Sequence, residues 1–123
     1  MAKVTIIGAG SVGSTIAFAM AIGGYVSEIV MIDINEEKVL GEALDIRQGV
    51  PFCPPVSIYA GSYRDAANSD IVVLTSGLAR KPGQTRLDLA QANVVILFLH
   101  CSKRINTLIS CPPIIRHKGS GRE

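Results

Sequence analysis

The first 33 residues of the chain divide into short apolar runs separated by a glycine-rich segment. Residues 4–7 form a continuous apolar run, which is typical of a strand buried on both faces of a parallel sheet. Residues 11–22 have helical character and end at two consecutive glycines, which stop a helix. The run EIVMID, residues 28–33, is rich in strand formers and ends in an acid. The pattern predicts strand, turn, helix and strand, in that order.

The rest of the chain continues this alternation of strands and helices. The later elements are predicted at residues 36–48 (helix), 57–60 (strand), 63–67 (helical turn) and 70–75 (buried strand), with a proline-broken loop over 49–55. Such an order predicts an α/β fold with a parallel sheet and right-handed crossovers. We expect the N-terminal half of a doubly wound, Rossmann-type sheet with strand order 3-2-1-4.

One alternative for the apolar start is a membrane segment. Residues 4–27 carry no charge and are long enough to cross a bilayer, which takes about 20 residues. Lys3 and the many alanines also imitate a secretory signal. However, a spanning helix needs neither the glycines nor the strand-like runs at both ends of the stretch. We therefore expect a soluble, cytoplasmic domain without a membrane partner.

The glycine-rich segment at residues 8–13 matches the pattern G-x-G-x-x-G between a predicted strand and a predicted helix. Gly8 permits a tight turn, Gly10 leaves room for a pyrophosphate, and Gly13 lets the helix pack close to the strand. The N–H groups and the positive dipole end of the helix, which begins at Ser11 and Val12, would point at the phosphates. These five residues are the first candidates for cofactor binding.

Asp33 lies 20 residues after Gly13, at the end of the next predicted strand. A carboxylate at this place accepts hydrogen bonds from the adenosine ribose hydroxyls of a dinucleotide. It would repel a 2′-phosphate, and the next residue is Ile34 rather than an arginine. The sequence therefore favours NAD over NADP. The alternative is that Asp33 is an ordinary residue at a strand end or a helix cap.

Ser76 and Gly77 follow the fourth predicted strand directly. Ligands of such sheets bind beyond the carboxyl ends of the strands, so both residues are further candidates for cofactor binding. Farther along, Thr85 is a candidate helix cap with Asp88 as its partner in the first turn.

The segment that follows Gly77, residues 78–88, carries three cations around a Pro-Gly turn, namely Arg80, Lys81 and Arg86. A cationic loop beside a cofactor suits a small anionic substrate, because a guanidinium group binds a carboxylate bidentately and can also polarise a carbonyl. The alternative is a solvated basic loop without a ligand.

The composition fits one globular domain. Hydrophobic residues make up 48% of the 123 residues and charged residues 18%, and the formal net charge of +2 is too small to indicate nucleic acid or an anionic membrane. The three cysteines, Cys53, Cys101 and Cys111, are odd in number and lack metal-binding spacing. We expect reduced thiols and no metal site.

Together these residues resemble the lactate/malate dehydrogenase family. The matching segments lie within residues 3–96 and read VTIIGAGSVGSTIAFAM, IVMIDIN, KVLGEALDIRQG, SDIVVLTSGLARKPGQTRLDL and QANVVI. The resemblance implies hydride transfer between NAD and a small mono- or dicarboxylic 2-hydroxy or 2-keto acid, under a mobile loop. It also implies a homo-oligomer for a full-length form.

The resemblance gives roles to two arginines of the loop. Arg86 matches the catalytic arginine that binds the substrate and polarises its carbonyl, and Arg80 matches the position that contacts the far end of the substrate. Malate enzymes have arginine at that position and lactate enzymes glutamine, since a second carboxylate needs a cation. Arg80 therefore favours malate, whereas the segment GQTRLDLAQ is more similar to lactate enzymes.

The resemblance ends after Ile96. Residues 1–96 contain seven Lys and Arg against nine Asp and Glu, whereas residues 97–123 contain five against one. We predict a truncated NAD-binding domain over residues 1–96 and a divergent tail over 97–123, explained by a shift of reading frame. The two histidines, His100 and His117, lie in this tail outside any family motif, and neither is assigned as a catalytic base.

Three functions remain open for a chain of this kind. It is an incomplete dehydrogenase that is inactive by itself, an NAD-binding fragment without chemistry, or a non-functional truncated product. The basic tail has one aromatic residue, Phe98, and no nucleic-acid motif, so no nucleic-acid partner is expected.

Overall fold

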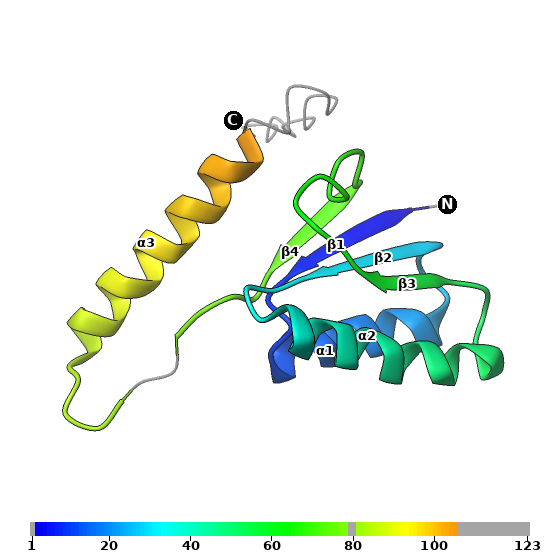
Figure 1. Ribbon diagram of the computed structural model, residues 1–123, viewed down its shortest axis with the longest axis horizontal. Helices are drawn as coiled ribbons and strands as arrows, with labels where there is room; N and C mark the ends of the chain where they lie inside the picture. Colours follow the sequence, from blue (N-terminus) through cyan, green and yellow to red (C-terminus); the bar gives the residue numbers. More distant parts are fainter. Residues whose placement is uncertain (1, 79–80, 106–123) are drawn as a thin grey trace, which may run out of the picture.

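The computed structural model describes residues 2–78 and 81–105, with the side chains up to residue 99 (Figure 1). The elements in chain order are β1 (Lys3–Ile7), α1 (Ser11–Gly23), β2 (Glu28–Ile32), α2 (Glu36–Gly49), the 3-10 helix η1 (Val50–Phe52), β3 (Ser57–Ala60), β4 (Ile71–Leu74) and α3 (Arg86–Ile105). Each predicted strand and helix before residue 76 is present, and no end differs from the prediction by more than one residue.

The four strands form one parallel sheet in the order β3-β2-β1-β4, so the predicted order is confirmed. Ile7 at the end of β1 pairs with Ile32 of β2 on one side and with Leu74 of β4 on the other. The carboxyl ends of these three strands therefore meet at one edge of the sheet. The segments that follow them, at residues 8–10, 33–35 and 75–78, begin side by side.

Both faces of the sheet are covered by apolar contacts. Helices α1 and α2 lie on one face (Figure 1), where Ala17 and Ala21 of α1 and Val39 and Ala43 of α2 pack against the strands. The other face carries a smaller cluster around Val30 and the turn of residues 63–68. Because the two central strands, β1 and β2, are buried from both sides, their sequences are largely apolar without alternation.

The apolar start of the chain is not one helix. Its uncharged residues 4–27 are divided between β1, the glycine turn and α1, and α1 ends at a left-handed cap residue, Gly24, as the glycine pair predicted. Over residues 2–78 and 81–105, no helix has the length and apolar character that a membrane span requires.

Helix α3 stands apart from the sheet, at the far end of an extended connection (Figure 1). It continues to Ile105 and so crosses the predicted boundary at Ile96 without a break. The later part of the predicted tail, residues 106–123, lies outside the described residues. The placement of a domain boundary at residue 96 stays a prediction.

Candidate dinucleotide-binding site

The glycine turn connects β1 to α1 at the carboxyl edge of the sheet. Gly8 has a φ of +106°, in the region that favours glycine, and its N–H donates to the carbonyl of Ile32 at 2.7 Å. A Cβ atom on Gly8 would lie 2.5 Å from the main-chain nitrogen of Ser76. The turn thus packs closely between the end of β2 and the segment after β4, and there is no space for a side chain at residue 8.

Gly13 lies in the first turn of α1, directly over the glycine turn. A Cβ atom there would overlap the carbonyl oxygen of Gly8 and lie 2.8 Å from Oγ1 of Thr75. The helix therefore packs close to the strand at this position, which is the predicted reason for a glycine here. The helix axis therefore starts as near to the sheet as the backbone allows.

Gly10 differs from these two glycines, because a Cβ atom on it would meet nothing within 4 Å. It is the N-cap residue of α1, where no side chain accepts a hydrogen bond, and the first turn of the helix contains no acidic residue. Ser11 and Val12 are exposed at this end. Open space next to uncapped N–H groups and the positive helix end fits an anionic phosphate group.

Asp33 follows β2 and faces the glycine turn. Its Oδ2 accepts the N–H of Ala9 at 2.6 Å, and its Oδ1 accepts the N–H of Asn35 at 3.1 Å. The carboxylate therefore has a structural role at the strand end, which was the alternative to ribose binding. The cap of α2 is Asn35, whose side chain accepts the N–H of Lys38 at 3.0 Å.

Asp33 could hold the turn and still bind a ribose, because each carboxylate oxygen has two lone pairs and the main-chain bonds use one on each oxygen. Tyr63 lies close enough for the negative charge of Asp33, together with burial as the larger cause, to raise the pKa of its phenol. A neutral hydroxyl group and a carboxylate thus lie near one another on this side of the turn.

The segment after β4 completes the carboxyl edge on the other side. Thr75 donates its N–H to the carbonyl of Ile7 at 2.8 Å and its hydroxyl to the carbonyl of Gly8 at 2.8 Å. The next hydroxyl, Oγ of Ser76, is buried and has no hydrogen-bond partner among the described residues. A buried hydroxyl without a partner is costly, so a ligand group that bonds to it would gain affinity.

Gly77 lies beside α3. Oδ1 of Asn93 accepts the N–H of Leu78 at 2.8 Å and would lie 3.3 Å from a Cβ atom on Gly77. The start of the loop is therefore attached to the middle of α3 by one side chain. Sequence reasoning missed both Asn93 and Thr75, and the only signal for Thr75 was its place at the end of a predicted buried strand.

The predicted helix cap at the start of α3 is present. The N–H of Thr85 donates to Oδ2 of Asp88 at 3.1 Å, and the N–H of Asp88 donates to Oγ1 of Thr85 at 3.2 Å. The hydroxyl of Thr85 also donates to this carboxylate and holds the pKa of Asp88 below its ordinary value. The reciprocal bonds are a capping box, and they fix where the helix begins.

Of the two arginines of the loop, the structure describes only Arg86. Arg86 is the exposed first residue of α3, which Figure 1 shows set apart from the carboxyl edge of the sheet. Arg80 lies outside the described residues. The structure thus brings together the predicted cofactor-binding residues but not the predicted catalytic arginine; those it brings together are Gly8, Gly10, Ser11, Val12, Gly13, Asp33, Ser76 and Gly77.

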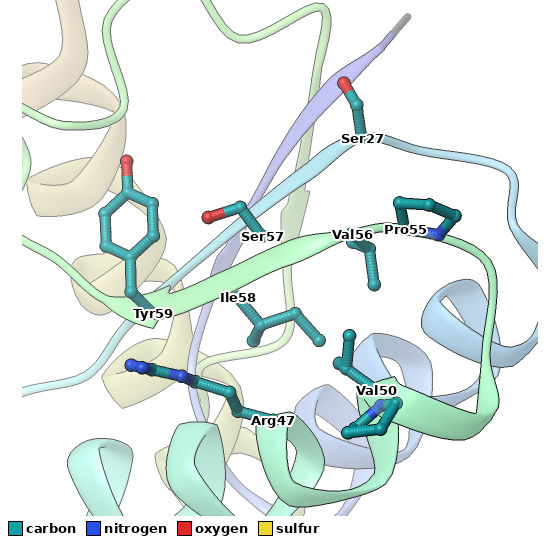
Figure 2. A pocket seen from close by; sticks show the side chains of 9 residues that line it. Ser27, Arg47, Val50, Pro55, Val56, Ser57, Ile58 and Tyr59 are labelled. Carbon is teal, nitrogen blue, oxygen red and sulfur yellow. The ribbon is translucent and has the colours of Figure 1, made fainter.

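A concave region lies beside the edge strand β3. This open hollow of about 840 Å³ runs along the outer side of β3, where Val50, Val56 and Ile58 converge beside Arg47 (Figure 2). Its lining runs from Ser27, which precedes β2, to Tyr59 of β3 and includes none of the predicted cofactor-binding residues. Among the side chains of residues 2–78 and 81–99, no three of the His, Cys, Asp and Glu types gather to hold a metal.

The parallel sheet, the glycine turn against an uncapped helix start and the acid at the end of β2 together define a dinucleotide-binding domain. The sequence profile described as "lactate/malate dehydrogenase, NAD binding domain" matches residues 2–111. The chain therefore belongs to the lactate/malate dehydrogenase family. NAD as the cofactor of this domain is confirmed at the level of the family.

Individual relatives agree with this assignment. The chain is 51% identical over 96 residues to the L-lactate dehydrogenase of Thermoanaerobacterium saccharolyticum, which covers 78% of this chain and 31% of that protein. It resembles the minor L-lactate dehydrogenase of Enterococcus mundtii with a TM-score of 0.84 and 41% identity, over 86% of this chain and 34% of that one.

A malate enzyme is also similar. The malate dehydrogenase of Archaeoglobus fulgidus, solved in complex with NADH, has a TM-score of 0.78 and 39% identity, over 85% of this chain and 36% of that one. In each comparison the chain spans about a third of the relative's length.

Proposed function

We propose that this chain is the NAD-binding part of an oxidoreductase that transfers hydride between NAD and a small 2-hydroxy or 2-keto acid. The observation that carries the proposal is the glycine turn, where open space over Gly10 adjoins the uncapped start of α1 and the carboxylate of Asp33. NAD, when bound, supplies the nicotinamide ring that accepts or gives the hydride. The protein residues described below bind and orient the cofactor.

The glycine turn would hold the pyrophosphate. The free N–H groups of Ser11, Val12 and Gly13 at the helix start donate to phosphate oxygens, and the absence of a side chain on Gly10 allows that approach. Gly8 contributes by keeping the turn tight, and Gly13 in addition lets α1 pack close to that turn.

Asp33 would select the nucleotide. The unused lone pairs of its two oxygens accept the ribose hydroxyls, and its charge repels a 2′-phosphate. Ile34 next to it is 91% exposed and offers no cation to such a phosphate. On the other side of the turn, Ser76, whose hydroxyl has no partner among the described residues, and Gly77 would line the continuation of the site.

The substrate would be bound by the loop of residues 78–88 when it closes. Arg86 polarises the substrate carbonyl, and Arg80 pairs with a second carboxylate, which favours malate or oxaloacetate. A second candidate is lactate, which is favoured because the matching curated relatives include several L-lactate dehydrogenases. The two substrates differ in whether the cation at residue 80 has a partner.

By itself, the 123-residue chain is expected to be catalytically inactive. Hydride transfer at the substrate carbon needs a general base that an orienting group holds in place. Neither histidine of the chain, His100 or His117, lies in a motif that matches the family, so neither is assigned this role. A shift of reading frame near residue 97 remains our explanation for the altered composition of the tail.

NADH titration of the purified chain tests the cofactor proposal. Binding enhances NADH fluorescence or appears as heat in calorimetry, and Asp33→Ala should weaken the affinity by about tenfold or more through the lost ribose bonds. Asp45→Ala, an exposed acid on α2, is the matched control and should bind like the original chain. No response to millimolar NADH would refute the proposal.

Activity is tested separately with oxaloacetate and with pyruvate. The isolated chain should consume no NADH with either substrate. NADH consumption that Arg86→Ala abolishes would overturn the expectation of inactivity, and its ratio between the two substrates would then show which acid is preferred.

A further inference from the structure

Thr75 extends the pairing of β4 and β1 into the glycine turn. Its N–H donates to the carbonyl of Ile7 at 2.8 Å, which continues the parallel ladder by one residue. Its hydroxyl donates to the carbonyl of Gly8, also at 2.8 Å. The second bond is not part of the ladder, because a side chain rather than the main chain provides the donor.

The acceptor of this bond belongs to a peptide group that is held at its other end as well. The carbonyl of Gly8 and the N–H of Ala9 are two ends of one planar peptide unit. Thr75 of the β4 side bonds to the oxygen, and Asp33 of the β2 side accepts the N–H at 2.6 Å. Both bonds together fix the rotation of this plane about the chain direction.

The orientation of this plane matters for the start of α1. The Gly8 carbonyl oxygen lies where a Cβ atom on Gly13 would be, so it points beneath the first helical turn and away from the open space over Gly10. If the plane rotated, the negative end of its dipole could turn towards that space. An anionic phosphate would then meet a carbonyl oxygen instead of N–H groups.

We propose that Thr75 is a positioning residue for the cofactor. Its hydroxyl fixes the Gly8–Ala9 peptide plane, so that the N–H groups at the start of α1 are directed towards the pyrophosphate before the cofactor arrives. The inference rests on the proposed binding of NAD by the glycine turn. It adds a residue that acts through the turn and does not itself touch the cofactor.

The test replaces Thr75 with valine, which has nearly the same shape but no hydroxyl, and with serine, which keeps the hydroxyl. The matched control is Thr5→Val. Thr5 is a fully buried threonine of β1, whose hydroxyl bonds to the hydroxyl of Ser69 at 2.7 Å. This bond lies at the amino-terminal end of β4, so the control loses a side-chain hydrogen bond of the same sheet away from the turn.

Three properties of the full chain are measured for each variant: the free energy of unfolding, the Kd for NADH, and the hydrogen exchange of the Ala9 amide without ligand. Thr75→Val and Thr5→Val should lose similar amounts of stability. Only Thr75→Val should raise the Kd, by about fivefold to tenfold, and Thr75→Ser should restore it. Equal Kd values for both valine variants, or a failure of serine to restore the Kd, would overturn the proposal.

The exchange measurement separates this proposal from the proposed function. Ala9 should exchange at least about fivefold faster in Thr75→Val than in Thr5→Val, because only the first change frees the peptide plane. If the original chain binds no NADH, the proposed function fails, and the exchange rates alone then decide whether Thr75 positions the turn. Equal exchange rates in the two valine variants would show that it does not.

Discussion

The same substitution, glycine to alanine, should have opposite effects at two helical positions of this protein. Gly13 lies in α1 and Gly41 in α2, and a Cβ atom on Gly41 would meet nothing within 4 Å. Alanine is the better helix former by about 1 kcal/mol. Gly41→Ala should therefore raise the free energy of unfolding by up to about 1 kcal/mol.

Gly13→Ala gains the same propensity but loses more through packing. Its Cβ would overlap the carbonyl oxygen of Gly8, so the start of α1 must move away by about 1 Å or more to reach ordinary contact. That shift loosens the contacts of Ala17 and Ala21, which are 0% and 2% exposed against the sheet. Overpacking of this kind costs about 2–3 kcal/mol, which leaves a net loss of roughly 1–2 kcal/mol.

Urea denaturation followed by circular dichroism at equal protein concentration measures both changes. The two variants should differ by about 2–3 kcal/mol with unchanged denaturant slopes, since both substitutions leave the surface exposed on unfolding nearly the same. A Gly13→Ala variant as stable as the original chain would refute the reasoning. It would mean that the helix start is not held against the turn as the structure describes.

Three further predictions concern single contacts. Gly10→Ala should weaken NADH binding by about tenfold or more while it changes the free energy of unfolding by less than about 1 kcal/mol, and unchanged binding would contradict the placement of the phosphates. The phenol of Tyr59 donates to Glu28 at 2.6 Å, and this bond raises the pKa of Tyr59 to about 12. The bond therefore stabilises the fold fully below the unfolded pKa of about 10, and this stabilisation is lost as the pH rises towards 12. Unfolding titrations between those pH values should show a steeper loss for the original chain than for Tyr59→Phe, and parallel curves would argue against the bond. Asn93→Ala should speed hydrogen exchange of the Leu78 amide without changing that of Ala9, and equal protection in both proteins would contradict an anchoring role for Asn93.

The parts of this fold that depend on nearby residues could be predicted from the sequence. The strand of residues 57–60, the glycine turn and the Thr85–Asp88 cap were each recognisable from a short stretch of sequence. The strand order followed from general rules for alternating strands and helices. The close packing at Gly13 was predictable for the same reason, because it joins neighbouring elements.

The contacts that sequence reasoning missed join distant parts of the chain. Thr75 reaches a carbonyl 67 positions earlier, and Asp33 reaches an amide 24 positions earlier. No local pattern specifies either bond, because both depend on which strands become neighbours and in which register. The predicted ribose contact of Asp33 did not include its bond to the Ala9 amide for that reason.

The arrangement of the loop and α3 was also beyond local reasoning. The capping box defines where α3 begins, yet it says nothing about the direction in which the helix leaves the sheet. That direction depends on contacts across the extended connection, of which the Asn93 bond to Leu78 is one. The role of Arg86 beside a substrate consequently stays a prediction.

The uncapped start of α1 links the stability of this protein to the composition of its solution. Its first N–H groups have no side-chain acceptor, so they donate to water until an anion displaces that water. A ligand present at 100 times its Kd would raise the free energy of unfolding by about 2.7 kcal/mol. Phosphate or sulfate in a buffer would act in the same direction as a nucleotide, in proportion to its own affinity. A melting temperature of this chain therefore describes a particular solution, and the choice of buffer anion is part of the measurement.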